Sequence, residues 1–229
     1  MTKSNRRTVR TMIGLGAGLL CAMLMAPDRG QAASISFNFT GSVGEVWGGV
    51  ITPNGFGADG FTTALPVSGG ITINPLARDS NSTSTTIGRY NAIQDFSLSV
   101  GTYVATYAPL TSFVRITNNA PGAGSDIYEL NITALSGSPV NGFSPSKFTL
   151  ELTDPTGSAF SSDALPAGAP SLSSFARSEF RLLFGSASTR VQGALQSLVP
   201  LPAAVWLFGA GLIALVGLGS RGLVTRKES

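Results

Sequence analysis

Three glutamates are the residues of this chain best suited to acid–base chemistry: Glu129, Glu151 and Glu179. Two carboxyl groups about 5–10 Å apart in a cleft can hydrolyse a glycosidic bond, one as an acid and the other as a base or nucleophile. Each glutamate lies on the polar side of an alternating segment, where solvated charges are the ordinary expectation. A carboxylate-dependent glycosidase is therefore one hypothesis, and a charged surface without catalysis is the other.

A second group of residues could offer oxygen ligands to Ca²⁺. It comprises Asn118, Asn119, Gly122, Gly124, Asp126 and Glu129. The spacing lacks the Asp-x-Asp-x-Asp-Gly order of a dedicated calcium loop, and Asn, Gly and Asp are also common turn residues. We therefore predict a turn here, and no metal or cofactor.

Aromatic side chains could bind a sugar by stacking on its ring, and the candidates are Trp47, Tyr103 and Tyr107. Packing in a hydrophobic core is the alternative role for each of them. The pattern alone does not separate the two roles.

The composition excludes several kinds of enzyme. The 229 residues include no histidine and one cysteine, Cys21, so Ser-His-Asp catalysis, histidine-bound zinc and disulfides within the chain are absent. The net charge of +3 comes from the two ends, because residues 34–198 hold seven basic and ten acidic residues and carry −3. We expect neither an enzyme nor a nucleic-acid-binding protein.

Residues 33–198 are predicted to form one all-β domain, because apolar and polar residues alternate in five segments. The apolar positions are Ile35-Phe37-Phe39, Phe96-Leu98-Val100, Tyr128-Leu130-Ile132, Phe148-Leu150-Leu152 and Phe180-Leu182-Phe184. Turn-forming clusters separate them, at 52–55, 118–124, 154–157 and 165–168. Many short antiparallel strands of this kind favour a β-sandwich, jelly-roll-like. Residues 79–86 are either an exposed loop or a polar edge strand.

Residues 1–32 have the layout of a secretory signal peptide. A basic start precedes fifteen apolar residues, Met12 to Ala26, and small residues at Gly30 and Ala32 suit a signal peptidase. We predict cleavage after Ala32. The general secretory route is favoured, and Arg6-Arg7 leaves twin-arginine export as the alternative.

The carboxyl end, residues 199–229, is predicted to enter the membrane. The segment 203–219 is uncharged and apolar, and as a helix it would be about 25 Å long. Val199-Pro200-Leu201-Pro202 precedes it, and each proline favours extended backbone in the residue before it. Arg221, Arg226 and Lys227 follow, so the positive-inside rule places the tail in the cytoplasm and residues 33–198 outside.

This carboxyl end resembles the PEP-CTERM sorting signals, in which a proline motif precedes one apolar helix and a short arginine-rich tail. The motif here is Val199, Pro200, Leu201, Pro202 and Ala203, close to the Val-Pro-Leu-Pro-Ala variant, with Leu201 where the name-giving motif has Glu. The resemblance implies an exosortase-type membrane protease as a partner, in a Gram-negative bacterium that makes an exopolysaccharide. It covers about 30 residues and carries no information on 34–198.

We therefore expect an exported protein, held briefly in the inner membrane and then processed to the cell surface or the extracellular matrix. Its role would be structural and non-enzymatic, linked to exopolysaccharide or biofilm, and its other partners would be signal peptidase and the export machinery. A glycan-binding module of the same matrix is the alternative, followed by a secreted glycosidase.

Overall fold

The computed structural model describes residues 34–51, 60–107, 111–133 and 135–201, all within a unit that begins at Ala33. The predicted signal peptide with its cleavage site at Ala32, the apolar segment 203–219 and the basic tail lie outside the described residues. Among the residues that are described, no helix has the length and apolar character needed to cross a bilayer.

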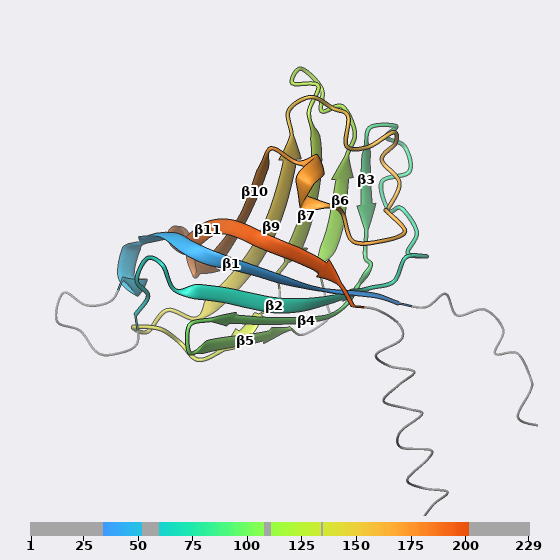
Figure 1. Cartoon of the computed structure of the whole chain (residues 1–229). Coiled ribbons are helices and arrows are strands. Elements are labelled where there is room, and N and C mark those ends of the chain that lie inside the picture. Colours follow the sequence, from blue (N-terminus) through green and yellow to red (C-terminus); the bar gives the residue numbers. More distant parts are fainter. Residues whose placement is uncertain (1–33, 52–59, 108–110, 134, 202–229) are drawn as a thin grey trace, which may run out of the picture. The chain divides into compact units, whose positions relative to one another are not determined.

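The described residues form an all-β domain with almost no helix (Figure 1). Its strands are β1 (Ile35–Trp47), β2 (Pro66–Ile73), β3 (Ile87–Tyr90), β4 (Ile93–Val100), β5 (Tyr103–Tyr107), β6 (Phe113–Thr117), β7 (Asp126–Ile132), β8 (Leu135–Gly137), β9 (Pro145–Asp154), β10 (Arg177–Phe184) and β11 (Ser186–Pro200). Two single turns of 3₁₀ helix, η2 (Gly48–Val50) and η3 (Leu172–Ser174), interrupt the connections.

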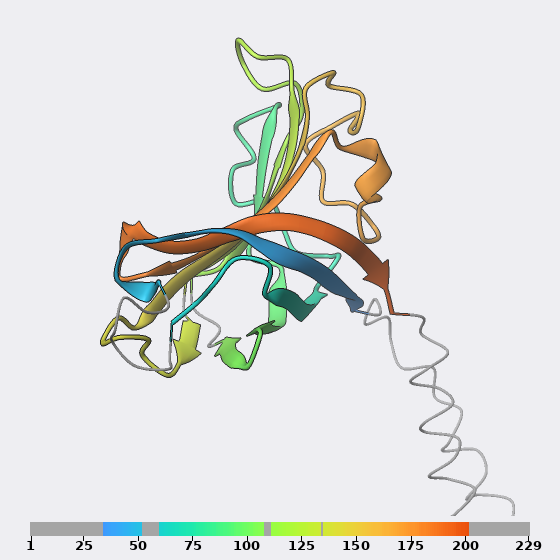
Figure 2. The ribbon, with the colours of Figure 1, turned by 60° about the vertical axis from the view of Figure 1, so that its left-hand side comes forward.

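All eleven strands belong to one antiparallel sheet in the order β3-β6-β7-β9-β10-β11-β1-β2-β4-β5-β8. The sheet curls strongly: β11, β1 and β2 cross the direction of β9, β7 and β6 at a steep angle in both views (Figures 1 and 2). β1 accommodates the bend through two irregularities in its pairing with β11, after Thr40 and after Val43. Extra residues at such bulges increase local twist and let a strand turn a corner.

The curl brings the apolar faces of the two halves of the sheet together, so the domain is sandwich-like although it has one continuous sheet rather than two. The ring of Phe148 in β9 lies 5.7 Å from that of Phe39 in β1 and 5.0 Å from that of Phe96 in β4. Phe180 in β10 stacks on Phe148 at 6.3 Å. These four rings join the halves in one buried core.

The five alternating segments all form strands, β1, β4, β7, β9 and β10, and their apolar residues are buried except Ile35, which is half-buried. The clusters at 118–124, 154–157 and 165–168 fall in turns and loops, and 52–55 lies outside the described residues. The segment 79–86 is a loop of turns with a single β-bridge at Asp79, so it is the loop and not the polar edge strand.

Candidate functional site

The strand register brings the three glutamates side by side. Glu129 in β7 is directly opposite Glu151 in β9, and Glu151 is directly opposite Glu179 in β10. Directly opposed side chains on one face have Cβ atoms about 5 Å apart. The glutamates therefore form a row across the outer face of the sheet, the face opposite the core.

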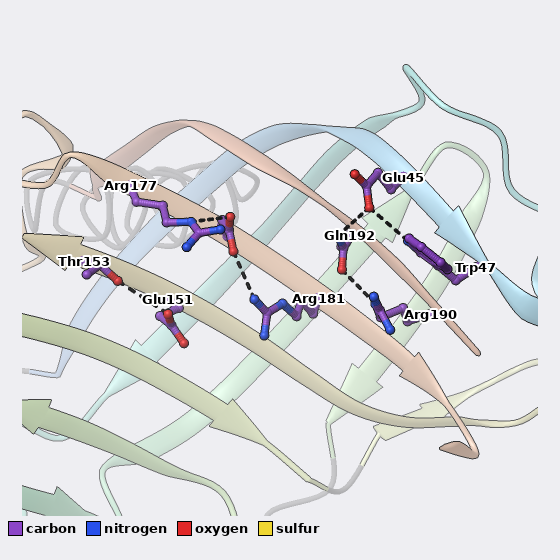
Figure 3. Close-up of polar contacts among 9 residues, drawn as sticks. Glu45, Trp47, Glu151, Thr153, Arg177, Arg181, Arg190 and Gln192 are labelled. Atoms are coloured by element: carbon purple, nitrogen blue, oxygen red, sulfur yellow. Dashed lines mark hydrogen bonds and ion pairs between the residues drawn. The ribbon is translucent and has the colours of Figure 1, made fainter. Parts of the chain in front are cut away.

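Arginines neutralise two of the three carboxylates. Glu129 pairs with Arg115, its neighbour across the strand in β6. Glu179 binds the Arg177 guanidinium at 2.6 Å and the Arg181 guanidinium at 3.2 Å (Figure 3). Like charges directly opposite one another destabilise a sheet, and these cations offset that repulsion.

The sequence prediction for Glu129 is wrong in one respect. Glu129 was expected to be solvated on a polar strand face, but it is only 7% exposed. Its strand β7 has neighbours on both sides in the sheet, β6 and β9, and the nearby Asn131 donates a hydrogen bond of 3.0 Å to the Glu129 carboxylate. Glu151 is half-buried, and it accepts a hydrogen bond of 3.4 Å from the Thr153 hydroxyl.

Most of the lysine and arginine side chains in the segment 34–198 lie on this same outer face. By register and strand alternation, six of the seven project from it, and Arg78 is the exception. We call the part of this outer face that lies on β3, β6, β7, β9, β10, β11 and β1 the charged face. Its ionisable members are Arg89, Arg115, Lys147, Arg177, Arg181, Arg190, Glu45, Glu129, Glu151 and Glu179.

A hollow of about 450 Å³ lies on the charged face over β7, β9, β10 and β11. The cationic side chains lining it are Lys147, Arg181 and Arg190, and the acidic ones are Glu129 and Glu151. Thr149 and Gln192 also line it. The hollow therefore presents hydrogen-bond donors, acceptors and both signs of charge.

Trp47 is at the end of a polar chain that leaves the hollow along the charged face (Figure 3). Arg190 donates a 2.8 Å hydrogen bond to Gln192, and Gln192 and Trp47 both donate to Glu45, at 2.7 and 2.9 Å. The Arg190 guanidinium lies 4.9 Å from the Trp47 ring centre, a cation–π contact. Trp47 is held in place although it is 48% exposed.

The other two aromatic candidates have structural roles. Tyr103 packs against the rings of Phe61 at 5.4 Å and Phe184 at 5.7 Å, and burial raises the pKa of its hydroxyl to about 12. The Tyr107 hydroxyl donates a 3.4 Å hydrogen bond to the carbonyl of Ile93. Neither side chain lies with Trp47.

The possible calcium ligands do not converge. Asp126 projects toward the core side of β7, and Glu129 projects from the charged face. The Asp126 carboxylate already accepts backbone N–H bonds from Asn119 at 2.8 Å and Phe160 at 2.7 Å. Within the part of the chain that the structure describes, no three acidic, histidine or cysteine residues gather as metal ligands.

The first residues of the predicted sorting motif belong to the domain. Val199 and Pro200 are the last residues of β11, opposite Asn38 and Phe37 of β1. The Leu201 N–H donates a 2.8 Å hydrogen bond to the Ser36 carbonyl. Pro202 and Ala203 lie outside the described residues.

No protein-family model, curated protein or solved structure matches this chain. Residue types and spacing in the sequence pointed to the glutamates and Trp47 but not to the arginines beside them. The period-two spacing of Arg177, Glu179 and Arg181 could have shown three charges on one strand face; the grouping across strands depends on register.

Proposed function

We propose that this chain is an exported surface or extracellular-matrix protein that an exosortase-type membrane protease processes at Val199–Ala203. The observation that carries the proposal is the position of β11. This last strand pairs with the first strand, β1, and Pro200 is opposite Phe37, so both ends of the described domain emerge side by side. A domain tied to a membrane at this end would keep the rest of its surface free.

The residues beyond the domain supply the other support for this proposal. Segment 203–219 is uncharged and apolar, and Arg221, Arg226 and Lys227 follow it. A helix at 203–219 would sit in the inner membrane until processing, with the domain outside and the tail inside. A signal peptide cut after Ala32 would lead the chain to the export machinery and signal peptidase.

We propose a non-enzymatic role for the exported domain in an exopolysaccharide or biofilm matrix. Two of its three neighbouring glutamates are neutralised by arginines, which suits a stable surface better than a proton-transfer site. By analogy of fold alone, sandwich and jelly-roll-like domains occur in capsid proteins and lectins. A glycan-binding module is the second candidate, favoured by exposed Trp47 beside the hollow.

The sorting proposal is tested by the mass of the protein in cells with and without an exosortase. Removal of residues 202–229 from a 23.5 kDa chain of 229 residues is a loss of about 3 kDa beyond signal cleavage. We expect this loss only when the enzyme is present. If the mature protein still ends at Ser229 when the exosortase is present, the sorting proposal is wrong and the segment is a simple single-pass anchor.

The double variant Pro200→Ala with Pro202→Ala tests the motif itself. It should insert in the membrane normally and accumulate as the full-length, signal-cleaved form, because the two prolines favour extended backbone before the helix. The matched control is Pro75→Ala with Pro139→Ala, two prolines in loops of the domain, which should be processed like the wild type. Equal processing of both double variants would contradict a role for the prolines.

A further inference from the structure

We propose that the charged face binds an anionic polysaccharide of the polyuronate class, a sugar chain that carries carboxylates. The inference rests on the second candidate function above and names its ligand class and its residues. Sorting at the carboxyl end does not depend on it.

Positive charge in the domain is concentrated on one face. Residues 34–198 carry −3 in total, but the charged face holds six basic residues against four glutamates. Half of the six, Lys147, Arg181 and Arg190, line one hollow. A domain that is acidic overall and concentrates its cations on one face is complementary to a polyanion at that face.

Cationic groups at the hollow retain the capacity to bind a carboxylate. Lys147 makes no ion pair within the described residues, and its three ammonium protons can each donate a hydrogen bond. Arg181 is 46% exposed and uses one nitrogen for Glu179. An exposed guanidinium binds a carboxylate through two parallel hydrogen bonds.

The hollow also offers partners for sugar hydroxyls, which both donate and accept hydrogen bonds. Glu151 and Thr149 line the hollow between the cations, and no cation pairs with Glu151 within the described residues. A sugar hydroxyl can therefore donate to Glu151 and accept from Lys147 or Arg181 within the same hollow.

Trp47 completes the match to a sugar. Its ring is exposed at the end of the Arg190–Gln192–Glu45 chain, in a fixed orientation, and an aromatic face packs against the C–H side of a pyranose. The six cations and Trp47 extend across strands β3 to β1, so the surface suits a polymer rather than a single sugar.

A carboxylated glycan fits this face better than a nucleic acid does. Duplex DNA carries one negative charge per about 1.7 Å of its axis and requires a nearly continuous basic surface. Here a row of three glutamates crosses the middle of the basic residues. Acceptor carboxylates next to cations repel a dense phosphate chain but bind the hydroxyls of a sugar chain.

The test measures binding of the full chain, kept in a neutral detergent, to alginate as the polyuronate probe. Neutral dextran and duplex DNA are the comparison polymers, and each is measured at low and high salt. The variants are Lys147→Gln and Arg181→Gln. The matched control is Arg78→Gln, the same loss of charge at the one basic residue of 34–198 that is off the charged face.

We expect alginate to bind, dextran to bind more weakly and salt to reduce the alginate affinity. Each charged-face variant should weaken alginate binding by about tenfold, and Arg78→Gln should leave it unchanged within about twofold. Three outcomes would each overturn the proposal. The chain could fail to bind alginate, it could prefer DNA or dextran to alginate, or Arg78→Gln could weaken alginate binding as much as the charged-face variants do. If binding fails while the 3 kDa carboxyl fragment is still removed, this inference falls and the sorting proposal stands.

Discussion

At the scale of single residues, acidic side chains have two different uses in this domain. Glu129 and Glu179 on the charged face pair with arginines, whereas Asp126 and Asp154 are opposite one another on the core side and hold loops. The Asp154 carboxylate accepts bonds from the Thr156 hydroxyl at 2.7 Å, the Thr156 N–H at 2.9 Å and the Ser158 N–H at 2.8 Å. The Ser158 hydroxyl and the Ala159 N–H donate to it as well. Its role is structural.

These bonds predict acid sensitivity of the fold. The Thr156 hydroxyl and N–H, with Ser158, hold the pKa of the Asp154 carboxyl well below its usual value. A depressed pKa in the folded state gives stability that is present above the unfolded pKa of about 4 and is lost as the pH falls toward the folded value. We expect the free energy of unfolding to fall below about pH 4.

The variant Asp154→Asn tests this assignment by urea unfolding at several pH values. The amide nitrogen of asparagine cannot accept the hydrogen bonds that one carboxylate oxygen accepts from the loop N–H groups. The variant should therefore be less stable at pH 7, and its free energy of unfolding should depend less on pH below 4. The control is Asp95→Asn, the same loss of a negative charge at an exposed position in β4, and the loss of stability at pH 7 should be larger in Asp154→Asn. An unchanged profile in Asp154→Asn would show that other groups cause the acid sensitivity.

At the scale of the elements, alternation in the sequence predicted five strands with large apolar residues and missed the longest strand, β11. Along most of its length β11 turns Thr189, Val191, Gly193 and Leu195 toward the core, so its pattern has little apolar contrast. In β2 the glycines Gly69 and Gly70 interrupt the alternation of apolar and polar residues in the same way. The glutamates were named from the sequence, but their row and the arginines beside it follow from register, which no local pattern contains.

Gly193 shows why small residues occur in β11. A Cβ at this position would overlap the backbone carbonyl oxygen of Ser42 in β1, so β11 and β1 approach too closely for any side chain. We predict that Gly193→Ala destabilises the domain by about 3 kcal/mol or more, because backbone cannot move aside as a flexible side chain can.

The measurement is urea unfolding followed by fluorescence, and the matched control is Gly168→Ala. Nothing lies within 4 Å of a Cβ built at Gly168, so this change should stay within about 0.5 kcal/mol of the wild type. Similar stability of the two variants would contradict the close approach of β1 and β11.

At the scale of the whole domain, the same pair of strands joins its beginning to its end. Leu198, Val199 and Pro200 are opposite Phe39, Asn38 and Phe37, and Leu201 is hydrogen-bonded to Ser36. A protease needs backbone that is free of such bonds, so the folded domain protects the chain up to Leu201. Of the predicted sorting motif, Val199, Pro200 and Leu201 are thus held by the folded domain.

We therefore predict that the processed protein ends at Leu201 or later, and that residues 198–201 stabilise it. A chain that ends at Ser197 should be less stable than one that ends at Leu201 by about 3 kcal/mol, because it loses several backbone hydrogen bonds worth about 1 kcal/mol each and the half-buried Leu198. Mass spectrometry gives the mature terminus, and urea unfolding compares the two truncated chains, each expressed with residues 1–32 as its leader. A chain that ends at Gly219 serves as the control for truncation itself and should be no less stable than the one that ends at Leu201.

Two outcomes would contradict this prediction. A mature terminus before Leu198 would mean that the protease acts on a chain whose last strand is free. Equal stability of the chains that end at Ser197 and at Leu201 would mean that the end of β11 is not needed to close the domain.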